Sequence, residues 1–232
     1  MRNIQDRKKN QKVVFKMLKL EKFTPEEFAS NNYLLYNDET KTAVLFDPSG
    51  CYDKVVKFIK ENNLNLKTLI VTHIHFDHLG DIKKYQDNFK EIKTVIPKDD
   101  KPMYENLMVQ CDLFGVKRVD NFKVDEFVDE NSKLFIDDIE IKIISTPGHS
   151  FGSTCYLIGD ILISGDTLFR EEIGRCDLPT GSFDDIKNSI KEKLFKLDSN
   201  VKVFPGHGDN SNIGHEKEFN AYFGLRAIYW WG

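Results

Sequence analysis

The 232-residue sequence predicts an α/β protein, and its pattern fits a four-layer αββα sandwich, in which two mixed β-sheets pack face to face and helices cover their outer surfaces. Short apolar runs that indicate strands alternate with amphipathic stretches that indicate helices. The strand-rich segments fall into two halves of the chain with helices between them, which fits two packed sheets. Hydrophobic residues make up 40% of the chain, enough at this length to bury one sizeable core.

The first half of the chain is expected to form one sheet and its helices. Short strands at residues 13–20, 32–36 and 43–47 precede an amphipathic helix at residues 52–61, which leads to a strand containing the apolar run 69–71. A helix at residues 80–88, a strand at 92–96 and a helix at 101–108 follow.

The second half begins to repeat this order. Strands are expected near residues 124–128, 134–136, 139–145, 155–159 and 161–164. A helix over residues 183–197, with Ser182 as its N-cap, precedes a strand at residues 201–204.

We expect a single domain over residues 13–232, after a flexible polar start at residues 1–12. The sequence shows no internal repeat, low-complexity tract or linker, and no apolar run near the roughly 20 residues that a membrane helix needs. No membrane partner is therefore expected. The basic start is followed by no continuous apolar segment of the kind that a secretory signal contains.

The charge pattern gives little support to a nucleic-acid partner. The net charge of −4 leaves the chain as a whole without a basic face, so no nucleic acid is expected to bind. Residues 1–22 are a local exception, with eight Lys or Arg against Asp6 and Glu21. They leave an RNA or anionic-surface contact open, but the favoured interpretation is a disordered start that leads into a half-exposed strand.

The residues that carry chemistry are concentrated in the run His73-Ile74-His75-Phe76-Asp77-His78, directly after the apolar stretch 69–71. Three imidazoles and a carboxylate are ligands that suit Zn²⁺ or another first-row divalent ion. Half of the chain's six histidines fall within these six positions, which a surface cluster without an ion does not explain. The run therefore predicts half of a two-metal site.

His149, Asp166 and His207 are predicted to supply the other half. Each lies in a turn of small residues directly after a predicted strand, in the sequences Pro-Gly-His-Ser, Gly-Asp-Thr and Pro-Gly-His-Gly. Four strand ends are therefore expected to converge on one site. The remaining histidine, His215, has no such turn and is expected to be an ordinary residue on a helix surface.

Together these residues resemble the signature of the metallo-β-lactamase superfamily, Thr-His-x-His-x-Asp-His followed by a distant His, Asp and His. The resemblance covers residues 72–79, 146–150, 165–169 and 205–208, in matching order over residues 13–220. It selects the four-layer sandwich, the superfamily's fold, over other α/β layouts. The segments 165–169, 173–179, 205–208 and 213–216 also look like the short glyoxalase II-like hydrolases.

The resemblance implies a division of the ligands between two divalent ions. One ion would be held by His73, His75 and His149, the second by Asp77, His78 and His207, and Asp166 would bridge them. Zn²⁺ is the expected metal, with Fe²⁺ or Mn²⁺ as alternatives. A hydroxide bridging the two ions would attack an acyl carbon while the ions stabilise the developing negative charge. Asp77 has an alternative role as a proton acceptor beside the bound water.

The same resemblance implies a thioester substrate of the S-lactoylglutathione type, the small-molecule partner that we expect. Arg175 falls where the family has a basic residue that contacts glutathione. Two departures bear on this expectation. Only 25 residues follow His207, which leaves no room for the C-terminal glutathione-binding domain of larger relatives, and Asp177 replaces a tyrosine and would repel a glutathione carboxylate.

Other functions compete with this hypothesis. Persulfide dioxygenases resemble the chain in fold and use one iron held by two His and one Asp, which makes them the second hypothesis. A β-lactamase is less favoured because the common dinuclear type carries Cys where Asp166 stands. An RNA-binding module acting through the basic start leaves the convergent ligands unexplained. Self-association as a homo-oligomer stays open.

Several residues near these motifs have two interpretations. Thr72 and Thr167 are candidates for hydrogen bonds to the ligands. Asp47, in Phe-Asp-Pro, either faces the site or begins a turn, and the turn is favoured. The aromatic residues of segment 221–232 either pack on the core, as favoured, or line an acyl pocket or a subunit contact.

The cysteines indicate a reducing compartment. Cys51, Cys111, Cys155 and Cys176 form no C-x-x-C pair and no dense framework, so we expect free thiols and a cytoplasmic location. Cys176 lies near the proposed site, but metal binding would occupy the histidines that could activate it. It is therefore interpreted as a small, at least partly buried residue.

Overall fold

The computed structural model describes residues 17–26 and 30–228. The expected flexible start at residues 1–12, most of the basic segment 1–22, and Tyr229, Trp230 and Trp231 lie outside the described residues.

The first sheet contains the strands of the N-terminal half, in spatial order β1 to β6. Strands β1 and β2 pair antiparallel with each other, as do β2 and β3, whereas β3 to β6 run parallel. The strands are β1 (Leu18–Phe23), β2 (Asn32–Asn37), β3 (Thr42–Phe46), β4 (Asn65–Ile70), β5 (Lys93–Pro97) and β6 (Glu126–Val128).

The second sheet contains the strands of the C-terminal half, in the order β12-β11-β10-β9-β8-β7. Only β10 and β11 are parallel among these neighbours. The strands are β7 (Leu134–Ile136), β8 (Ile139–Ser145), β9 (Thr154–Ile158), β10 (Ile161–Gly165), β11 (Lys202–Pro205) and β12 (Ser211–Asn212). Both sheets are mixed, as the sequence predicts.

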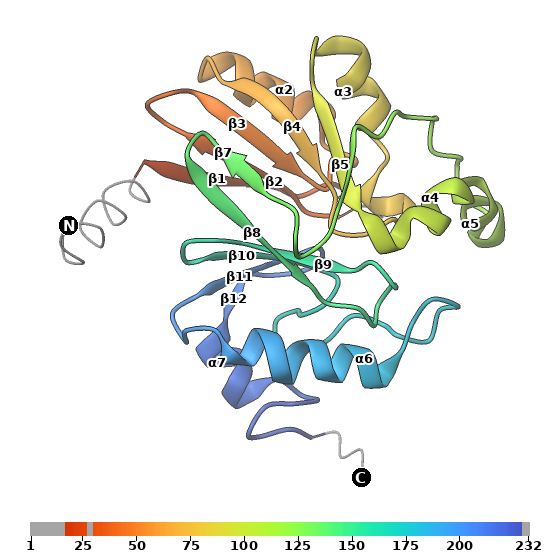
Figure 1. The fold of residues 1–232 in the computed structure, drawn as a ribbon, viewed down its shortest axis with the longest axis vertical. Coiled ribbons are helices and arrows are strands. Elements are labelled where there is room, and N and C mark those ends of the chain that lie inside the picture. Colours follow the sequence, from red (N-terminus) through yellow and green to blue (C-terminus); the bar gives the residue numbers. More distant parts are fainter. Residues whose placement is uncertain (1–16, 27–29, 229–232) are drawn as a thin grey trace.

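Helices cover the outer face of each sheet, which completes the four layers (Figure 1). Helices α2 (Tyr52–Glu61) and α3 (Ile82–Asn88) lie on the first sheet, and α6 (Phe183–Asn188) and α7 (Ile213–Phe219) on the second. Helices α4 (Lys101–Glu105) and α5 (Leu107–Phe114) lie at the side, beside the seam between the two halves. The four-layer αββα prediction is confirmed.

Three apolar clusters fill the three interfaces between these layers. Neighbouring residues of β2 show the alternation that this requires: Leu34 faces α2 and α3, whereas Tyr33 and Leu35 face the second sheet. In β9, Tyr156 packs between the sheets and Cys155 packs under α6. Because both faces of the central strands are buried, they appear in the sequence as continuous apolar runs.

Most predicted elements are present with shifts of one to three residues at their ends. The helix at residues 52–61 and the strands at 134–136 and 139–145 have the predicted bounds. The strand expected at residues 13–20 is observed as Leu18–Phe23, within the described part of the chain. The helix expected at 183–197 begins as α6 and continues through a π-helical stretch (Ser189–Lys193) and a 3₁₀ turn (Leu194–Lys196).

The single helix expected at residues 101–108 is wrong, because the chain forms α4 and α5 with a break at Asn106. The Asn106 side chain donates a hydrogen bond to the Pro102 carbonyl at 2.8 Å, a local bond that competes with continuation of the helix. The change of direction lets Leu107 and Cys111 of α5 enter the core.

The topology brings the ends of several strands to one edge of the sandwich. The loops after β4, β8, β10 and β11 all leave their sheets at the seam, where the two halves meet. None of the helices in the described part of the chain is long and apolar enough to span a membrane.

The observed helix caps give a test of local stability. Ser182 accepts a hydrogen bond from the Asp185 backbone N–H at 3.2 Å and caps α6, as predicted. Replacing Ser182 by Ala should lower the free energy of unfolding by about 1 kcal/mol, measured by urea denaturation. Ser199→Ala is the matched control, since Ser199 is exposed and caps no helix; equal effects of both changes would contradict the capping role.

Candidate metal centre

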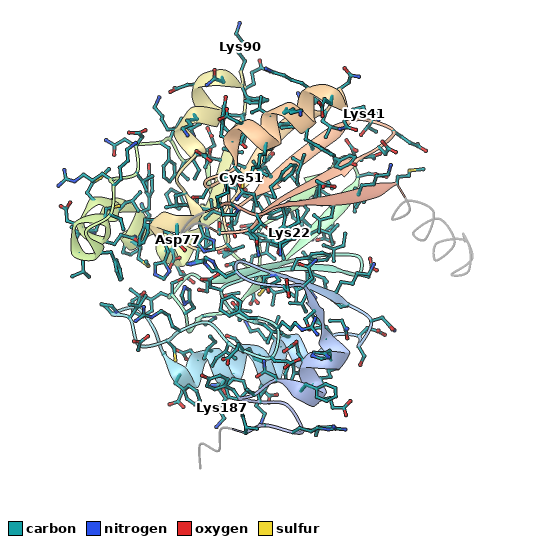
Figure 2. The ribbon with its side chains drawn as sticks, turned by 180° about the vertical axis from the view of Figure 1, so that it is seen from behind. Lys22, Lys41, Cys51, Asp77, Lys90 and Lys187 are labelled. Carbon is teal, nitrogen blue, oxygen red and sulfur yellow. The ribbon has the colours of Figure 1, made fainter. Side chains whose placement is uncertain are left out.

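The first group of candidate ligands lies in the loop that follows β4. His73 and His75 come from the extended loop, and a 3₁₀ turn (Phe76–His78) then turns Asp77 and His78 toward the same space. His73 and His78 are almost completely buried, whereas the Asp77 side chain keeps 22% of its surface exposed. Asp77 lies at the seam between the two halves (Figure 2).

The second group comes from the other sheet. His149 follows β8, Asp166 follows β10 and His207 follows β11. The Gly206 N–H donates to the Gly165 carbonyl at 2.8 Å, which holds the last two turns side by side. Four strand ends therefore converge, as the turn sequences indicate.

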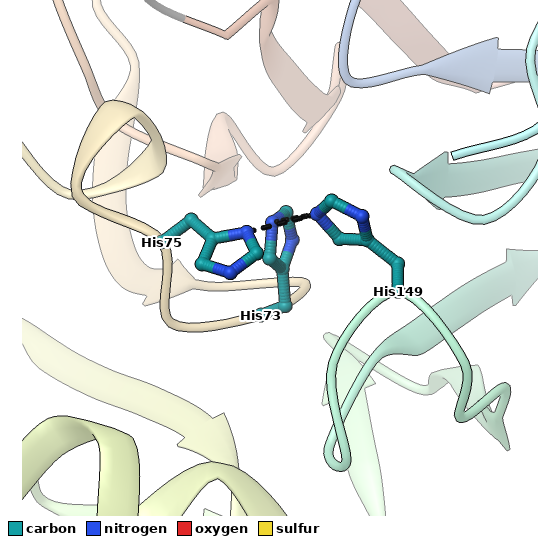
Figure 3. Close-up of side chains that lie close together, drawn as sticks. All are labelled: His73, His75 and His149. Atoms are coloured by element: carbon teal, nitrogen blue, oxygen red, sulfur yellow. Dashed lines mark hydrogen bonds between the residues drawn. The ribbon is translucent and has the colours of Figure 1, made fainter. Parts of the chain in front are cut away.

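Three histidines face one another closely across the seam (Figure 3). His149 Nε2 lies 2.8 Å from His75 Nδ1 and 3.1 Å from His73 Nε2. Nitrogen ligands arranged tetrahedrally around Zn²⁺ at ~2.1 Å are about 3.4 Å apart, only slightly more than this spacing. The trio is one of three groups in the described chain whose donor atoms could hold a cation together.

A second cluster adjoins the trio. His207 Nε2 lies 3.2 Å from Asp77 Oδ2 and 3.4 Å from Asp166 Oδ2, and His78 Nε2 lies 3.5 Å from Asp166 Oδ1. Asp166 Oδ2 is also 3.6 Å from His149 Nε2 of the trio. Asp166 therefore lies between the two sets of histidines, with one oxygen atom close to both.

Hydrogen bonds orient two of the rings so that their lone pairs face the site. The Thr72 hydroxyl donates to Asp47 Oδ2 at 2.9 Å, so its oxygen accepts from His73 Nδ1 at 3.1 Å. His149 Nδ1 lies 2.7 Å from the Arg175 carbonyl, which can only accept. In both rings Nδ1 is the donor to a neighbouring oxygen and Nε2 faces the centre, which is the orientation of metal-binding histidines.

The residues fit divalent cations. His73 Nε2 and His149 Nε2 lie 3.1 Å apart, close enough to be ligands of one cation. His78 Nε2 and Asp166 Oδ1 are fully buried and have no hydrogen-bond partner. Buried polar atoms without a partner are costly, and a bound cation is the partner that both a histidine nitrogen and a carboxylate oxygen accept.

Burial and charge divide the histidines into two kinds. Burial, together with the neighbouring histidines, lowers the pKa of His73 well below its usual value and that of His75 to about 3. Both rings are thus neutral at physiological pH, the form that binds a cation.

The second cluster has the opposite balance. Burial opposes a charge on His78, but the carboxylates of Asp166, Asp47 and Asp77 raise its pKa well above the usual value. Burial likewise opposes a charge on His207, but contacts with Asp166 and Asp77 raise its pKa to about 9. Burial raises the pKa of Asp166, but the His78 charge and contacts with His207 hold it well below the ordinary value. The carboxylates of this cluster therefore stabilise a positive charge that lies between them.

Asp47 faces the site, so the prediction that favoured a simple turn is wrong. Its carboxylate accepts from the Thr72 N–H at 2.8 Å and from the Thr72 hydroxyl, and Oδ2 lies 3.1 Å from His78 Nδ1 without hydrogen-bonding to it. Asp47 has a positive φ of 50°, which turns the side chain at the end of β3 inward. The sequence pattern alone does not show that the Asp47 side chain points into the site.

Asp100 is a supporting residue that the sequence did not reveal. It is completely buried and accepts from the Ile74 N–H at 2.9 Å, the Ser150 hydroxyl at 2.9 Å and the Gly152 N–H at 2.7 Å. One carboxylate thereby ties the loop of His73 and His75 to the loop of His149. In the sequence, Asp100 looks only like a polar residue before a helix.

Glycine allows the backbone to come unusually close to Asp166. A Cβ atom at Gly174 would overlap the Asp166 carbonyl oxygen, and one at Gly206 would overlap Asp166 Oδ1 and the His78 ring. The back wall of the site is therefore main chain, with no room for side chains at these two positions.

The structure places the remaining predicted residues outside the ligand cluster. The exposed Arg175 guanidinium makes two hydrogen bonds of 2.8 Å with Asp177, so the proposed contact of its side chain with substrate stays a prediction. Thr167 bonds to Thr146 rather than to a ligand atom. His215, on α7, contacts Glu171 at 2.7 Å.

The cysteines and the aromatic segment also have structural roles. All four cysteines are free, and only Cys176 is partly exposed. Tyr222 and Phe223 pack against the cluster under α6 and α7, in agreement with core packing.

Comparison with known proteins shows which family the chain belongs to. The profile of the metallo-β-lactamase superfamily matches residues 25–207. The chain belongs to this superfamily. Hydroxyacylglutathione hydrolase GloC of Haemophilus influenzae is 31% identical over 203 residues, which cover 86% of this chain and 95% of GloC.

Solved structures agree with the fold. The B3 metallo-β-lactamase BLEG-1 has a TM-score of 0.80 and 30% identity, covering 88% of this chain and 99% of BLEG-1. TTHA1623, solved in a di-iron-bound form, has a TM-score of 0.77 and 27% identity, covering 88% of this chain and 100% of TTHA1623. The chain is therefore a metallo-hydrolase of this superfamily, with clustered His and Asp sites for metal.

The position of Asp166 between the two clusters generates a prediction. Asp166→Ala should lower metal content by half or more and hydrolysis by more than the roughly 10–100-fold that loss of a supporting group costs. Metal is measured by atomic spectrometry after dialysis. Asp160→Ala is the matched control, an exposed aspartate before the same strand, 3.4 Å from Lys202. Full activity of Asp166→Ala would overturn the two-metal assignment.

Asp47 gives a second prediction. Asp47→Asn keeps the shape of the side chain but removes the charge beside Thr72 and His78, so metal affinity should fall roughly 10–100-fold while the fold is retained. Competition with a chromophoric chelator measures the affinity, and circular dichroism checks the fold. Asp38→Asn, an exposed partner of Lys19 and Lys41, should leave affinity unchanged. Equal affinities in all three proteins would show that Asp47 does not support the site.

Proposed function

We propose that this protein is a thioester hydrolase that uses two divalent cations, of the hydroxyacylglutathione hydrolase type. The observation that carries the proposal is the convergence of seven His and Asp side chains in two adjoining clusters with Asp166 between them. The similarity to GloC along almost its whole length supports a thioester as the substrate.

The residues divide naturally between two cations. The trio of His73, His75 and His149 would hold one, Asp77, His78 and His207 the other, and Asp166 would contact both. Bound there, the cations supply Lewis acidity and lower the pKa of a coordinated water. Zn²⁺ is the expected metal, with Fe²⁺ or Mn²⁺ as alternatives, since all three accept mixed nitrogen and carboxylate ligands.

Hydrolysis adds the oxygen of water to the acyl carbon and breaks the bond between that carbon and sulfur. The sulfur leaves with the bonding electrons as a thiolate, and the water proton is released to a base. A thiolate is a good leaving group, so no strong general acid is required. This matches a site whose histidines are turned toward the centre as ligands.

Asp77 is the carboxylate that solvent and substrate reach most easily. Its side chain is 22% exposed, against 9% for Asp166. The charge of His78 and the contact with His207 hold the pKa of Asp77 below its ordinary value, although burial opposes this. Asp77 is thus ionised near neutral pH and is placed to orient a water molecule or accept its proton.

The direct test is thiol release under anaerobic conditions. Protein loaded with Zn²⁺, loaded with Fe²⁺ or freed of metal is given S-lactoylglutathione and, separately, an acetyl thioester of a small neutral thiol. Metal-dependent release of thiol from either substrate is the expected result, with Asp166→Ala as the inactive control.

Other outcomes assign other activities. Lack of thiol release by fully loaded protein would contradict the thioesterase proposal. Oxygen consumption with a persulfide by the iron form would then support a persulfide dioxygenase. Cleavage of a β-lactam by the zinc form would support the activity that the name of BLEG-1 states for that protein.

A further inference from the structure

An apolar pocket opens directly beside the metal centre. It has a volume of about 330 Å³, and the ligand His75 forms part of its wall. The remaining walls come from Asp99, from α4 and α5 with Asn106 between them, and from two loops of the second half. Besides two prolines, their apolar members are Met103, Val109, Leu113, Phe114, Phe151 and Leu178.

The exposed apolar surface of the protein is concentrated around this opening. Eight large hydrophobic side chains are well exposed in the described residues, and four of them line the pocket. Leu113 is 69% exposed, Val109 64% and Phe151 56%. Exposed apolar groups gathered in one concave place mark a binding site, whereas single scattered ones do not.

The pocket offers nothing to balance the charges of glutathione, which carries two carboxylates. The described residues that line it include one charged side chain, the carboxylate of Asp99, and none of them is Lys or Arg. Arg175 is the basic residue expected to hold glutathione, but its guanidinium donates two hydrogen bonds to Asp177. An acidic ligand group would be desolvated here without a cationic partner.

The pocket wall is fixed to the loop that carries the metal ligands. Gln110 of α5 donates to the Ile74 carbonyl at 2.8 Å and accepts from the Phe76 N–H at 3.2 Å. The rings of Phe76 and Phe114 also pack together, with centroids 5.6 Å apart. A group bound in the pocket is therefore held at a constant position relative to His73 and His75.

We propose that this pocket binds an uncharged apolar group of the substrate, an alkyl chain or an aromatic ring attached to the thioester. The inference rests on the proposed thioesterase function and names its substrate class: thioesters with an apolar substituent, in preference to glutathione thioesters. The apolar group belongs either to the acyl side or to the thiol side of the sulfur, and the experiment separates the two.

The test uses two series of substrates with metal-loaded protein. In one, N-acetylcysteamine is the constant thiol and the acyl group grows from acetyl through butyryl to octanoyl. In the other, acetyl is constant and the thiol becomes more apolar. Each methylene that enters an apolar pocket strengthens binding by roughly fourfold. The kcat/KM should therefore rise roughly tenfold or more along one series, which identifies the side of the sulfur that the pocket holds.

Variants on α5 locate the effect. Val109→Ser and Leu113→Ser should each lower the ratio of kcat/KM for the longest to the shortest substrate of that series by roughly fivefold or more. Both side chains are exposed, so the fold tolerates the change, and a ratio is insensitive to a loss of folded enzyme. Phe135→Ser is the matched control. Phe135 is 51% exposed but lies on β7 and does not line the pocket. The ratio of kcat/KM for the longest to the shortest substrate should therefore keep the wild-type value in this variant.

The outcomes separate this inference from the proposed function. Metal-dependent hydrolysis with kcat/KM independent of substituent size in both series would overturn the pocket assignment and leave the thioesterase intact. A size preference that both serine variants retain in full would overturn the location. Absence of thioester hydrolysis in every arm would overturn the proposed function, and this assignment with it.

Discussion

The charge balance at the seam between the two sheets is the constraint on which the rest of the structure depends. Imidazoles and carboxylates from both halves are buried within a few ångströms of one another, and three of their buried atoms, His78 Nδ1, His78 Nε2 and Asp166 Oδ1, lack a hydrogen-bond partner. Rigid supports are needed to hold such a cluster together, and bound cations would supply the missing partners. Asp47 and Asp100 are those supports. Each is buried, and the carboxylate oxygens of each accept hydrogen bonds from the loops that carry the ligands.

Much of the fold follows from local sequence because its layers impose strong patterns. Strands buried on both faces appear as apolar runs, and α2, with Val55 and Ile59 on its buried side, shows a regular amphipathic period. The break between α4 and α5 was not predictable, because the local pattern of residues 101–108 indicates one helix. The chain forms two helices because Leu107 and Cys111 pack in the core and because the Asn106 side chain hydrogen-bonds to the Pro102 carbonyl.

The candidate ligands were predictable for a different reason. His and Asp in small-residue turns after strands are uncommon unless they are used, and the order of the motifs is specific. The supports were not predictable in this way. Asp47 and Asp100 stand in contexts typical of turns and helix starts, and the acceptor for His149 is a backbone carbonyl, that of Arg175, which leaves no trace in residue type.

The two sides of the active site differ in what they are made of. Its back wall is main chain, closed by Gly174 and Gly206 against Asp166, so almost any replacement there disturbs the ligands themselves. Its open side is formed by protruding side chains of α5, whose exchange costs the folded protein little. If the pocket binds the substrate as proposed, selection could change the range of substrates through the exposed side chains of one short helix while the metal ligands and their chemistry are inherited unaltered, so that a lineage could acquire new specificities without passing through inactive intermediates.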